Sequence, residues 1–264
     1  MRESLNLAQI RQRQLEMLDI FDDFCTTRGI KYSLSGGSLL GAVRHKGFIP
    51  WDDDVDLMMP RPEYERFLAS FNKENVDIKA INYRVDPDFP RPFTKITDLG
   101  TKIAARNGIN KYGIFLDLFP VDGQPDNEEE TSEYVAEYER LNRLFYKKTP
   151  LYRMSDNLLV KIKSAIRGPF FPPREETMSK IKSLLQRYPF GSTGFAGAIM
   201  GGSKMGTHVP DRVFKEFTRM EFEGRSISCI KDYDTYLTRM YGDYMTPPPP
   251  RKQKTNHFAA VYRV

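Results

Sequence analysis

The segment from Ser35 to Leu57 constrains the fold most strongly, because it couples a glycine turn to a cluster of acidic residues. Gly36, Gly37 and Ser38 follow a short apolar stretch and precede a helix-like run. Backbone amides at such a helix start can accept a phosphate, because glycine has no Cβ in the way. Alone, this Gly-Gly-Ser turn is a weak signal, since many ordinary tight turns share it.

A cluster of acidic residues follows the Gly-Gly-Ser turn and makes that turn a stronger functional signal. Its members are Asp52, Asp53, Asp54 and Asp56. Alternation with apolar residues predicts a strand over Asp54–Met58 in which Asp54 and Asp56 share one face. Adjacent carboxylates repel each other unless a cation lies between them, and Mg²⁺ prefers oxygen ligands. Phosphate turn and metal pair together favour chemistry on a nucleotide or a diphosphate.

Other interpretations of the acidic cluster differ in how well they fit. A solvated acidic loop and the Asp-x-Asp site of glycosyltransferases both remain open. A calcium loop of the EF-hand kind requires glycine where Leu57 stands.

The rest of the chain mixes helical periodicity with short apolar runs, which predicts an α+β fold. Helices are expected over 5–28, 39–44, 62–71, 128–147, 176–187 and 233–240, and strands over 30–34, 54–58, 78–83 and 113–120. Asp117 lies within the last of these strands and is costly to bury unless it meets a cation. A hydrogen-bonded structural aspartate is the alternative. Without repeats or long linkers, residues 1–264 are interpreted as one domain.

A basic helical insertion is expected at about 140–174, which holds nine basic residues against one acid. An apolar helical face accompanies them, formed by Leu158, Leu159, Ile162, Ala165 and Ile166. Such a segment suits peripheral contact with an anionic membrane. Packing of the apolar face onto the core is the alternative.

Bulk composition narrows the partners and the compartment. The net charge of +5 suits an anionic partner, although ordinary surface charge gives the same value. No basic stripe with interleaved stacking aromatics accompanies the site, so nucleic acid is not expected. Cys25 and Cys229 are too few for a disulfide framework or a zinc site. With no signal-like apolar stretch, the expected location is cytoplasmic or peripheral at the inner membrane face.

The motifs together closely resemble the LicD family. The blocks that carry the resemblance run from Gly37 to Asp56, from Met59 to Tyr64, from Phe115 to Asp122 and from Tyr241 to Met245. The resemblance implies the nucleotidyltransferase fold of DNA polymerase β, a mixed central sheet flanked by helices. It also implies phosphocholine transfer from CDP-choline to glycans such as teichoic acid precursors or lipopolysaccharide. Related fukutin-related proteins transfer ribitol phosphate from CDP-ribitol.

The resemblance also implies roles for single residues. Gly36, Gly37 and Ser38 match the phosphate turn, and Asp54, Asp56 and Asp117 match the metal-binding and catalytic carboxylates, with Mg²⁺ expected and Mn²⁺ an alternative. Further substrate-binding candidates are Arg44, His45, Lys46, Trp51 and Lys95. The basic side chains among them can offset diphosphate charge. Trp51 can face a trimethylammonium or pack behind the aspartates, and Tyr32 and Phe48 are other nearby aromatic residues.

The expected reaction is metal-dependent transfer of phosphocholine to a hydroxyl of a glycan or lipid-linked glycan acceptor, with release of CMP. Transfer of another alcohol phosphate such as ribitol phosphate is one alternative. Nucleotidyl transfer from CTP or ATP is a second, and a non-catalytic glycan-binding scaffold is a third.

Overall fold

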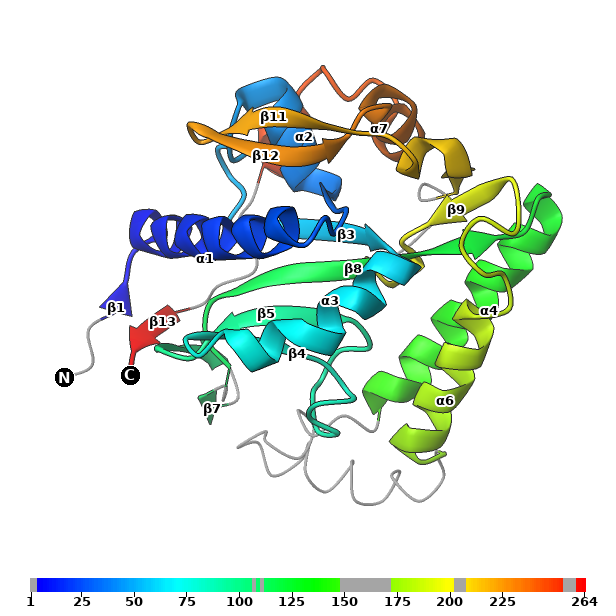
Figure 1. The fold of residues 1–264 in the computed structure, drawn as a ribbon, viewed down its shortest axis with the longest axis horizontal. Helices are drawn as coiled ribbons and strands as arrows, with labels where there is room; N and C mark the ends of the chain where they lie inside the picture. The colour runs from blue at the N-terminus through cyan, green and yellow to red at the C-terminus, as the bar shows by residue number, and fades with distance from the viewer. Residues whose placement is uncertain (1–3, 106–107, 110–111, 148–171, 202–207, 254–259) are drawn as a thin grey trace.

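The computed structural model describes residues 4–105, 108–109, 112–147, 172–201, 208–253 and 260–264 (Figure 1). The described helices are α1 (Leu7–Thr27), α2 (Gly36–His45), α3 (Arg61–Glu74), α4 (Glu128–Lys147), α6 (Arg174–Leu185) and α7 (Tyr233–Tyr241). Short 3₁₀ turns lie at Ile199–Gly201, Asp211–Phe214 and Pro250–Lys252. None of the helices in these ranges is long and apolar enough to cross a membrane.

The central sheet is mixed. Its strands are β2 (Ser33–Leu34), β3 (Asp56–Pro60), β4 (Ile78–Ile81), β5 (Thr94–Asp98), β8 (Phe115–Gln124), β9 (Phe195–Gly197) and β10 (Val209–Pro210). β3 runs parallel to β8, and the other described pairings in this sheet are antiparallel. β8 is its longest strand and pairs with β3 on one side and with β5 and then β9 on the other. This arrangement agrees with the predicted α+β class and mixed sheet.

Two smaller sheets complete the described structure. β1 (Ser4–Leu5), β13 (Ala260–Arg263), β6 (Thr101–Ala105) and β7 (Gly108–Ile109) form one of them and join the two ends of the chain. The other is a hairpin of β11 (Phe217–Phe222) and β12 (Arg225–Ile230). In Figure 1 this hairpin lies beside α2 and α7, above the central sheet.

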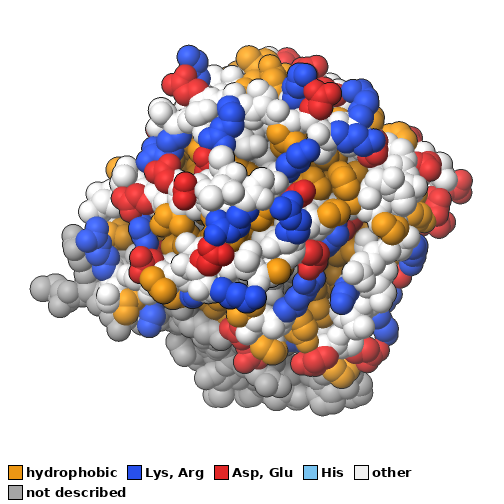
Figure 2. Space-filling model, in the orientation of Figure 1, with side chains coloured by type: hydrophobic (Ala, Val, Ile, Leu, Met, Phe, Trp, Pro, Cys, Tyr) orange, Lys and Arg blue, Asp and Glu red, His pale blue; other side chains and the backbone are white. Residues whose placement is uncertain are grey.

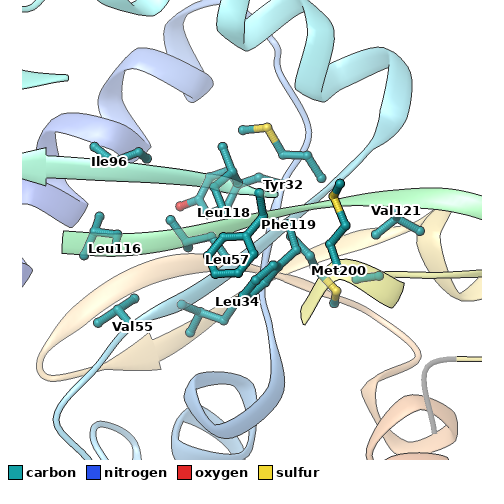
Figure 3. Close-up of a cluster of buried hydrophobic side chains, with 14 of the residues drawn as sticks. Tyr32, Leu34, Val55, Leu57, Ile96, Leu116, Leu118, Phe119, Val121 and Met200 are labelled. Carbon is teal, nitrogen blue, oxygen red and sulfur yellow. The ribbon is translucent and has the colours of Figure 1, made fainter. Parts of the chain in front are cut away.

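The main core lies on one face of the central sheet. Successive side chains along a strand alternate between the two faces of the sheet, so Leu116 and Leu118 of β8 point the same way. Figure 3 shows these two with Leu34, Leu57 and Ile96 from neighbouring strands. The same side of the sheet carries Asp98 and Asp122, which bind Arg13 of α1 and Arg61 of α3. Asp56, Lys95 and Asp117 occupy the alternate positions and therefore share the opposite face.

Several local predictions need correction. The strand expected over 54–58 begins at Asp56, so Asp54 belongs to the preceding loop. The helix expected from Leu39 begins at Gly36, so Gly36, Gly37 and Ser38 form its first turn. The run predicted to end at Pro120 continues as a strand to Gln124, because an antiparallel neighbour, β9, pairs with its last residues. The helix over Glu128–Lys147 is confirmed.

The basic segment at 140–174 falls largely outside the described residues, since 148–171 are not among them. Its contact with a membrane or with the core therefore stays a prediction. Arg174, counted among its charges, is buried and donates hydrogen bonds to the carbonyl oxygens of Pro87 and Phe89. That charge therefore belongs to internal packing and is not available to an anionic surface.

Surface charge is mixed on the face seen in Figure 2. Lys and Arg side chains are interspersed there with Asp and Glu. The excess positive charge of the chain therefore forms no continuous basic area on the described part of this face.

Candidate active site

Three neighbouring strands, β3, β8 and β5, place two aspartates and one lysine side by side. In the parallel pair, Asp56 of β3 lies opposite Asp117 of β8. In the antiparallel pair, Asp117 lies opposite Lys95 of β5. The three side chains therefore form a row across the sheet, with Asp117 in the middle.

Asp54 completes a group of three carboxylates. One oxygen from each of Asp54, Asp56 and Asp117 lies within 4.8 Å of the others. Asp54 reaches this place from the loop before β3, while Val55 between the two acids is fully buried. The predicted pairing of the two side chains is thus confirmed, although only one of them lies in a strand. A second group, Asp52, Asp53 and Asp54, meets the same distance limit.

The charge of this cluster is costly in the protein alone. Burial, followed by the charges of Asp54, Asp117 and Asp52, raises the pKa of Asp56 well above its usual range. Lys95 opposes that rise but does not cancel it. Carboxylate oxygens held this close to one another fit a hard divalent cation such as Mg²⁺.

The first turn of α2 lies directly over the acidic cluster. Ser35 donates its backbone N–H to the Asp56 carbonyl oxygen at 2.9 Å, and Asp56 donates its own N–H to Ser38 Oγ at 2.9 Å. Ser38 therefore positions Asp56 by a hydrogen bond. Gly36 has φ +50, and a Cβ there would lie 3.4 Å from Asp56 Oδ2. A Cβ on Gly37 would lie 2.8 Å from Asp52 Oδ2, so both glycines allow a close approach of carboxylates to the turn.

The α2 amino end is suited to an anion. Ser35 precedes the helix but makes no side-chain capping bond, because its hydroxyl contacts Tyr236 Oη at 3.2 Å. The first backbone amides of a helix have no partner within it and carry partial positive charge. A phosphate group placed here would lie beside the carboxylate cluster.

Helix α1 supports the acidic loop from behind. Arg11 donates hydrogen bonds to the carbonyl oxygens of Ile49, Pro50 and Asp52. Gln14 is fully buried and donates to the carbonyl oxygen of Asp53. These contacts fix the backbone of the loop, so the carboxylates are positioned before any ligand binds.

Lys95 lies inside the site. Its Nζ is 2.5 Å from Asp117 Oδ1 and 3.1 Å from the centre of the Phe115 ring. Burial lowers the pKa of Lys95, and the adjacent Asp117 works against that shift. From the sequence, Lys95 was one of the further substrate-binding candidates. The structure places it in direct contact with Asp117, which is a predicted catalytic carboxylate.

The other basic candidates lie at the opposite end of α2. His45 is nine positions after Gly36, which is about 13.5 Å along a helix. Arg44 donates to the Tyr244 carbonyl oxygen and to His45, and Lys46 pairs with Glu221 of β11. Burial, then the Arg44 charge, lowers the pKa of His45. The structure therefore does not bring these three to the amino end of α2.

The aromatic candidates also take structural positions. Tyr32 is buried in the core and donates its hydroxyl to Asp22. Phe48 is buried against Phe222, with their ring centres 5.1 Å apart. Trp51 is partly buried and packs against the core, as the packing interpretation of this residue expected.

Two tyrosines of α7 reach the site and were not singled out as site residues from the sequence. Tyr236 meets Ser35, and the Tyr241 hydroxyl would lie 3.6 Å from a Cβ on Gly36. Burial raises the pKa of both phenols, so they are neutral hydrogen-bonding groups. The block from Tyr241 to Met245 is one of those that carry the family resemblance, and this was the signal in the sequence that could have identified Tyr241 as a site residue.

Comparisons with known proteins identify relatives of this chain. The nucleotidyltransferase domain of the LicD/FKTN/FKRP family matches residues 29–148. The lipopolysaccharide cholinephosphotransferase LicD of Haemophilus influenzae is 32% identical over 264 residues, which cover 96% of this chain and 97% of the relative. Human ribitol 5-phosphate transferase FKRP is 69% identical over 29 residues, 11% of this chain and 6% of FKRP. An uncharacterised protein of Rickettsia typhi is 37% identical over 87 residues, 32% of this chain and 24% of that protein.

Proposed function

Because the chain belongs to the LicD/FKTN/FKRP family, we propose that it transfers phosphocholine from CDP-choline to a hydroxyl of a lipopolysaccharide-type or related cell-surface glycan, with release of CMP. The observation that carries this proposal is the carboxylate group Asp54, Asp56 and Asp117 beside the amino end of α2. Similarity to a cholinephosphotransferase over almost the whole length of both chains supports the choice of reaction.

The proposed architecture is the nucleotidyltransferase fold. A helix that starts at a glycine turn and an acidic pair that opens the next strand support this assignment. A third carboxylate at the adjacent position of a parallel neighbour supports it too.

Asp54, Asp56 and Asp117 would hold Mg²⁺, or Mn²⁺ in its place. When bound, the ion would neutralise the donor diphosphate and polarise the reacting phosphorus. The close approach of the three carboxylates and the raised pKa of Asp56 support this assignment, since a cation relieves both repulsion and burial of charge.

The protein's own groups would bind the donor and stabilise the charges that develop during the reaction. The backbone amides at the start of α2 would bind the donor diphosphate, and the Tyr241 hydroxyl, beside Gly36, would be a further donor. Lys95 places positive charge next to Asp117. The acceptor oxygen attacks the phosphorus that carries choline, and Asp117 accepts the proton of that hydroxyl. The new phosphorus–oxygen bond joins phosphocholine to the glycan, while the bond from the same phosphorus to CMP breaks and CMP leaves with its oxygen. Preorganised charge of this kind contributes most to catalysis where water is excluded.

Ribitol phosphate is the second candidate for the transferred group. A short segment 69% identical to ribitol 5-phosphate transferase FKRP favours it. Because that segment covers only 6% of FKRP, it supports the shared reaction class more than the choice of alcohol.

The experiment that tests the proposed function measures the release of CMP and of pyrophosphate. Purified protein is incubated with Mg²⁺, a lipopolysaccharide acceptor and either CDP-choline, CDP-ribitol or CDP-glycerol. We expect CMP release from CDP-choline, dependent on the acceptor and stopped by EDTA. CMP from CDP-ribitol alone would replace the choline assignment and keep the mechanism. Pyrophosphate from CTP, with no CMP from any CDP-alcohol, would disprove the reaction class.

A further inference from the structure

A cleft lies between α3 and α6, away from the carboxylate cluster. Its volume is about 350 Å³, within the range of about 300–1,000 Å³ found for small-molecule sites. Tyr64 of α3 lines it and bonds to Thr94 of β5. Thr94 is next to Lys95 in the strand, so the cleft is on the face of the sheet opposite the carboxylates. Figure 2 shows hydrophobic side chains in the hollow between these two helices.

The strand pairing leaves room for this cleft. On one edge of β8, β5 pairs with residues 115–118 and β9 pairs with residues 122–124, so the three residues between have no described strand neighbour there. Met200 packs beside this gap, close to Phe119 and Val121 in Figure 3, and also lines the cleft. The cleft is therefore set by the topology of the sheet.

The floor of the cleft is apolar and aromatic. Tyr64, Leu185 and Met200 are buried there. The Tyr64 hydroxyl is already used by Thr94, so the ring offers its carbon surface. Tyr83 is only partly buried, and its ring leaves apolar surface open in the cleft. A ligand bound here would place an apolar face on this floor.

The two arginines of the cleft are already neutralised by carboxylates. Arg61 donates to both oxygens of Asp122, at 2.6 Å each. Arg84 donates to both oxygens of Glu65, at 2.5 and 2.8 Å. A site for a phosphate or an anionic lipid head would instead present unpaired arginines or several lysines.

One face of α6 gives the cleft a polar rim. Four of its exposed side chains line the cleft at helical spacing: Glu175, Ser179, Lys182 and Gln186. The two charged ones have opposite signs, so the rim offers donors and acceptors without a net charge. An apolar floor with such a rim fits a sugar ring, whose C–H face packs on apolar surface while its hydroxyls meet polar groups.

We propose that the α3–α6 cleft binds a neutral sugar unit of the glycan acceptor, at a distance from the reacting hydroxyl. The identity of this glycan rests on the proposed function. A long acceptor that contacts both the cleft and the carboxylate site binds more tightly than either contact alone allows. The cleft thus acts on acceptor affinity and not on the chemical step.

The test is isothermal titration calorimetry in EDTA, so that no divalent ion contributes at the carboxylates. The probe is the oligosaccharide released from lipopolysaccharide by mild acid, which removes the lipid, and then dephosphorylated. Wild type is expected to bind it. Ser179→Trp places an indole in the cleft and is expected to weaken binding at least about tenfold. Tyr83→Leu removes the aromatic ring and is expected to weaken binding in the same direction.

The matched control is Ser183→Trp. Ser183 is exposed on the same helix and does not line the cleft, so this variant is expected to keep the wild-type affinity. No binding by wild type, or equal affinities of wild type and Ser179→Trp, would overturn the proposal. Binding to phosphatidylglycerol vesicles that Ser179→Trp abolishes, with oligosaccharide binding unchanged, would overturn it in favour of a lipid.

Turnover separates this proposal from the proposed function. With Mg²⁺, CDP-choline and lipopolysaccharide, Ser179→Trp is expected to raise the KM for the acceptor and to leave kcat and the KM for the donor as in wild type. An unchanged acceptor KM would contradict the role of the cleft in acceptor binding. Absence of CMP release from every CDP-alcohol in wild type would contradict the proposed function, and the calorimetry would still decide the sugar site.

Discussion

At the scale of single residues, the negative charge of Asp56 opposes folding of the metal-free protein. Its folded pKa is raised, so the ionised form is disfavoured by folding. The cost begins as the pH rises past the unfolded value of about 3.9 and is complete above the folded pKa. In metal-free protein, Asp56→Asn should therefore unfold at a temperature about 2–4 °C higher than wild type at pH 7, the shift expected for about 1 kcal/mol. The difference should vanish near pH 4.

Thermal melts in EDTA and then in millimolar Mg²⁺ check this prediction. Mg²⁺ should stabilise wild type and leave Asp56→Asn unchanged, because only a site with its full charge retains the ion. The variant should also lose turnover. A variant that is less stable than wild type in EDTA, or that still gains stability from Mg²⁺, would refute the assigned electrostatic role.

Residue-level prediction from the sequence worked where the signal was local. The alternation around Val55 predicted that Asp54 and Asp56 lie together, and an acid in an apolar run drew attention to Asp117. The three carboxylates do lie together, although Asp54 lies outside the strand. The contact of Lys95 with Asp117 had no such signal. It depends on the register of two strands that pair across 22 residues, and register is set by the whole sheet.

At the scale of elements, the start of α2 depends on a glycine in a conformation that other residues adopt at a cost. Gly36 has φ +50 and Gly29, which follows α1, has φ +59. A Cβ at Gly36 would approach Asp56 and Tyr241, whereas a Cβ at Gly29 would meet nothing within 4 Å. The two positions therefore separate backbone strain from loss of the site.

We predict that Gly36→Ala and Gly29→Ala each cost about 1–2 kcal/mol of stability. Only Gly36→Ala should raise the KM for the donor, because only there would the new methyl group intrude on the proposed phosphate turn. Chemical unfolding measures the first effect and steady-state kinetics the second. Equal kinetic losses in the two variants would mean that Gly36 acts through stability alone.

Element prediction was good for strongly periodic segments and poor for short strands. The helix over Glu128–Lys147 shows clear periodicity and was predicted in full. The hairpin of β11 and β12 was not predicted. In the structure its turn residues, Glu223 and Gly224, both have positive φ, as two-residue hairpin turns of this kind require. Strand β5 was missed because its polar and apolar residues give too short a pattern to separate it from a loop.

At the scale of the whole molecule, the hairpin contacts α1 and the segments before and after α2, which are distant from it in sequence. Glu223 accepts a hydrogen bond from the Phe48 backbone N–H, and Ser228 donates to the Tyr32 carbonyl oxygen. Arg219 of β11 binds both oxygens of Asp22 in α1 at 2.8 and 2.7 Å. None of these pairings could be read from sequence, since they join residues far apart in the chain.

The Arg219–Asp22 pair should make stability depend on acid pH. Burial alone would raise the pKa of Asp22, but hydrogen bonds from Arg219 and Tyr32 lower it overall. A lowered folded pKa contributes stability above the unfolded value of about 3.9, and that contribution disappears as the pH falls through the folded value. Arg219→Ala should therefore cost about 0.5–1 kcal/mol at pH 7, a modest value because Arg219 is 43% exposed. The cost should shrink below about pH 4.

Urea unfolding of wild type and variant across this pH range measures the difference. Arg212→Ala is the matched control, because Arg212 pairs with Asp232 in a contact where the arginine is 64% exposed, and its loss should cost less at every pH. A cost for Arg219→Ala that stays constant from pH 7 to pH 3 would show that the arginine acts through packing of its side chain. A cost that shrinks as the pH falls would show that the charge pair itself joins the hairpin to α1.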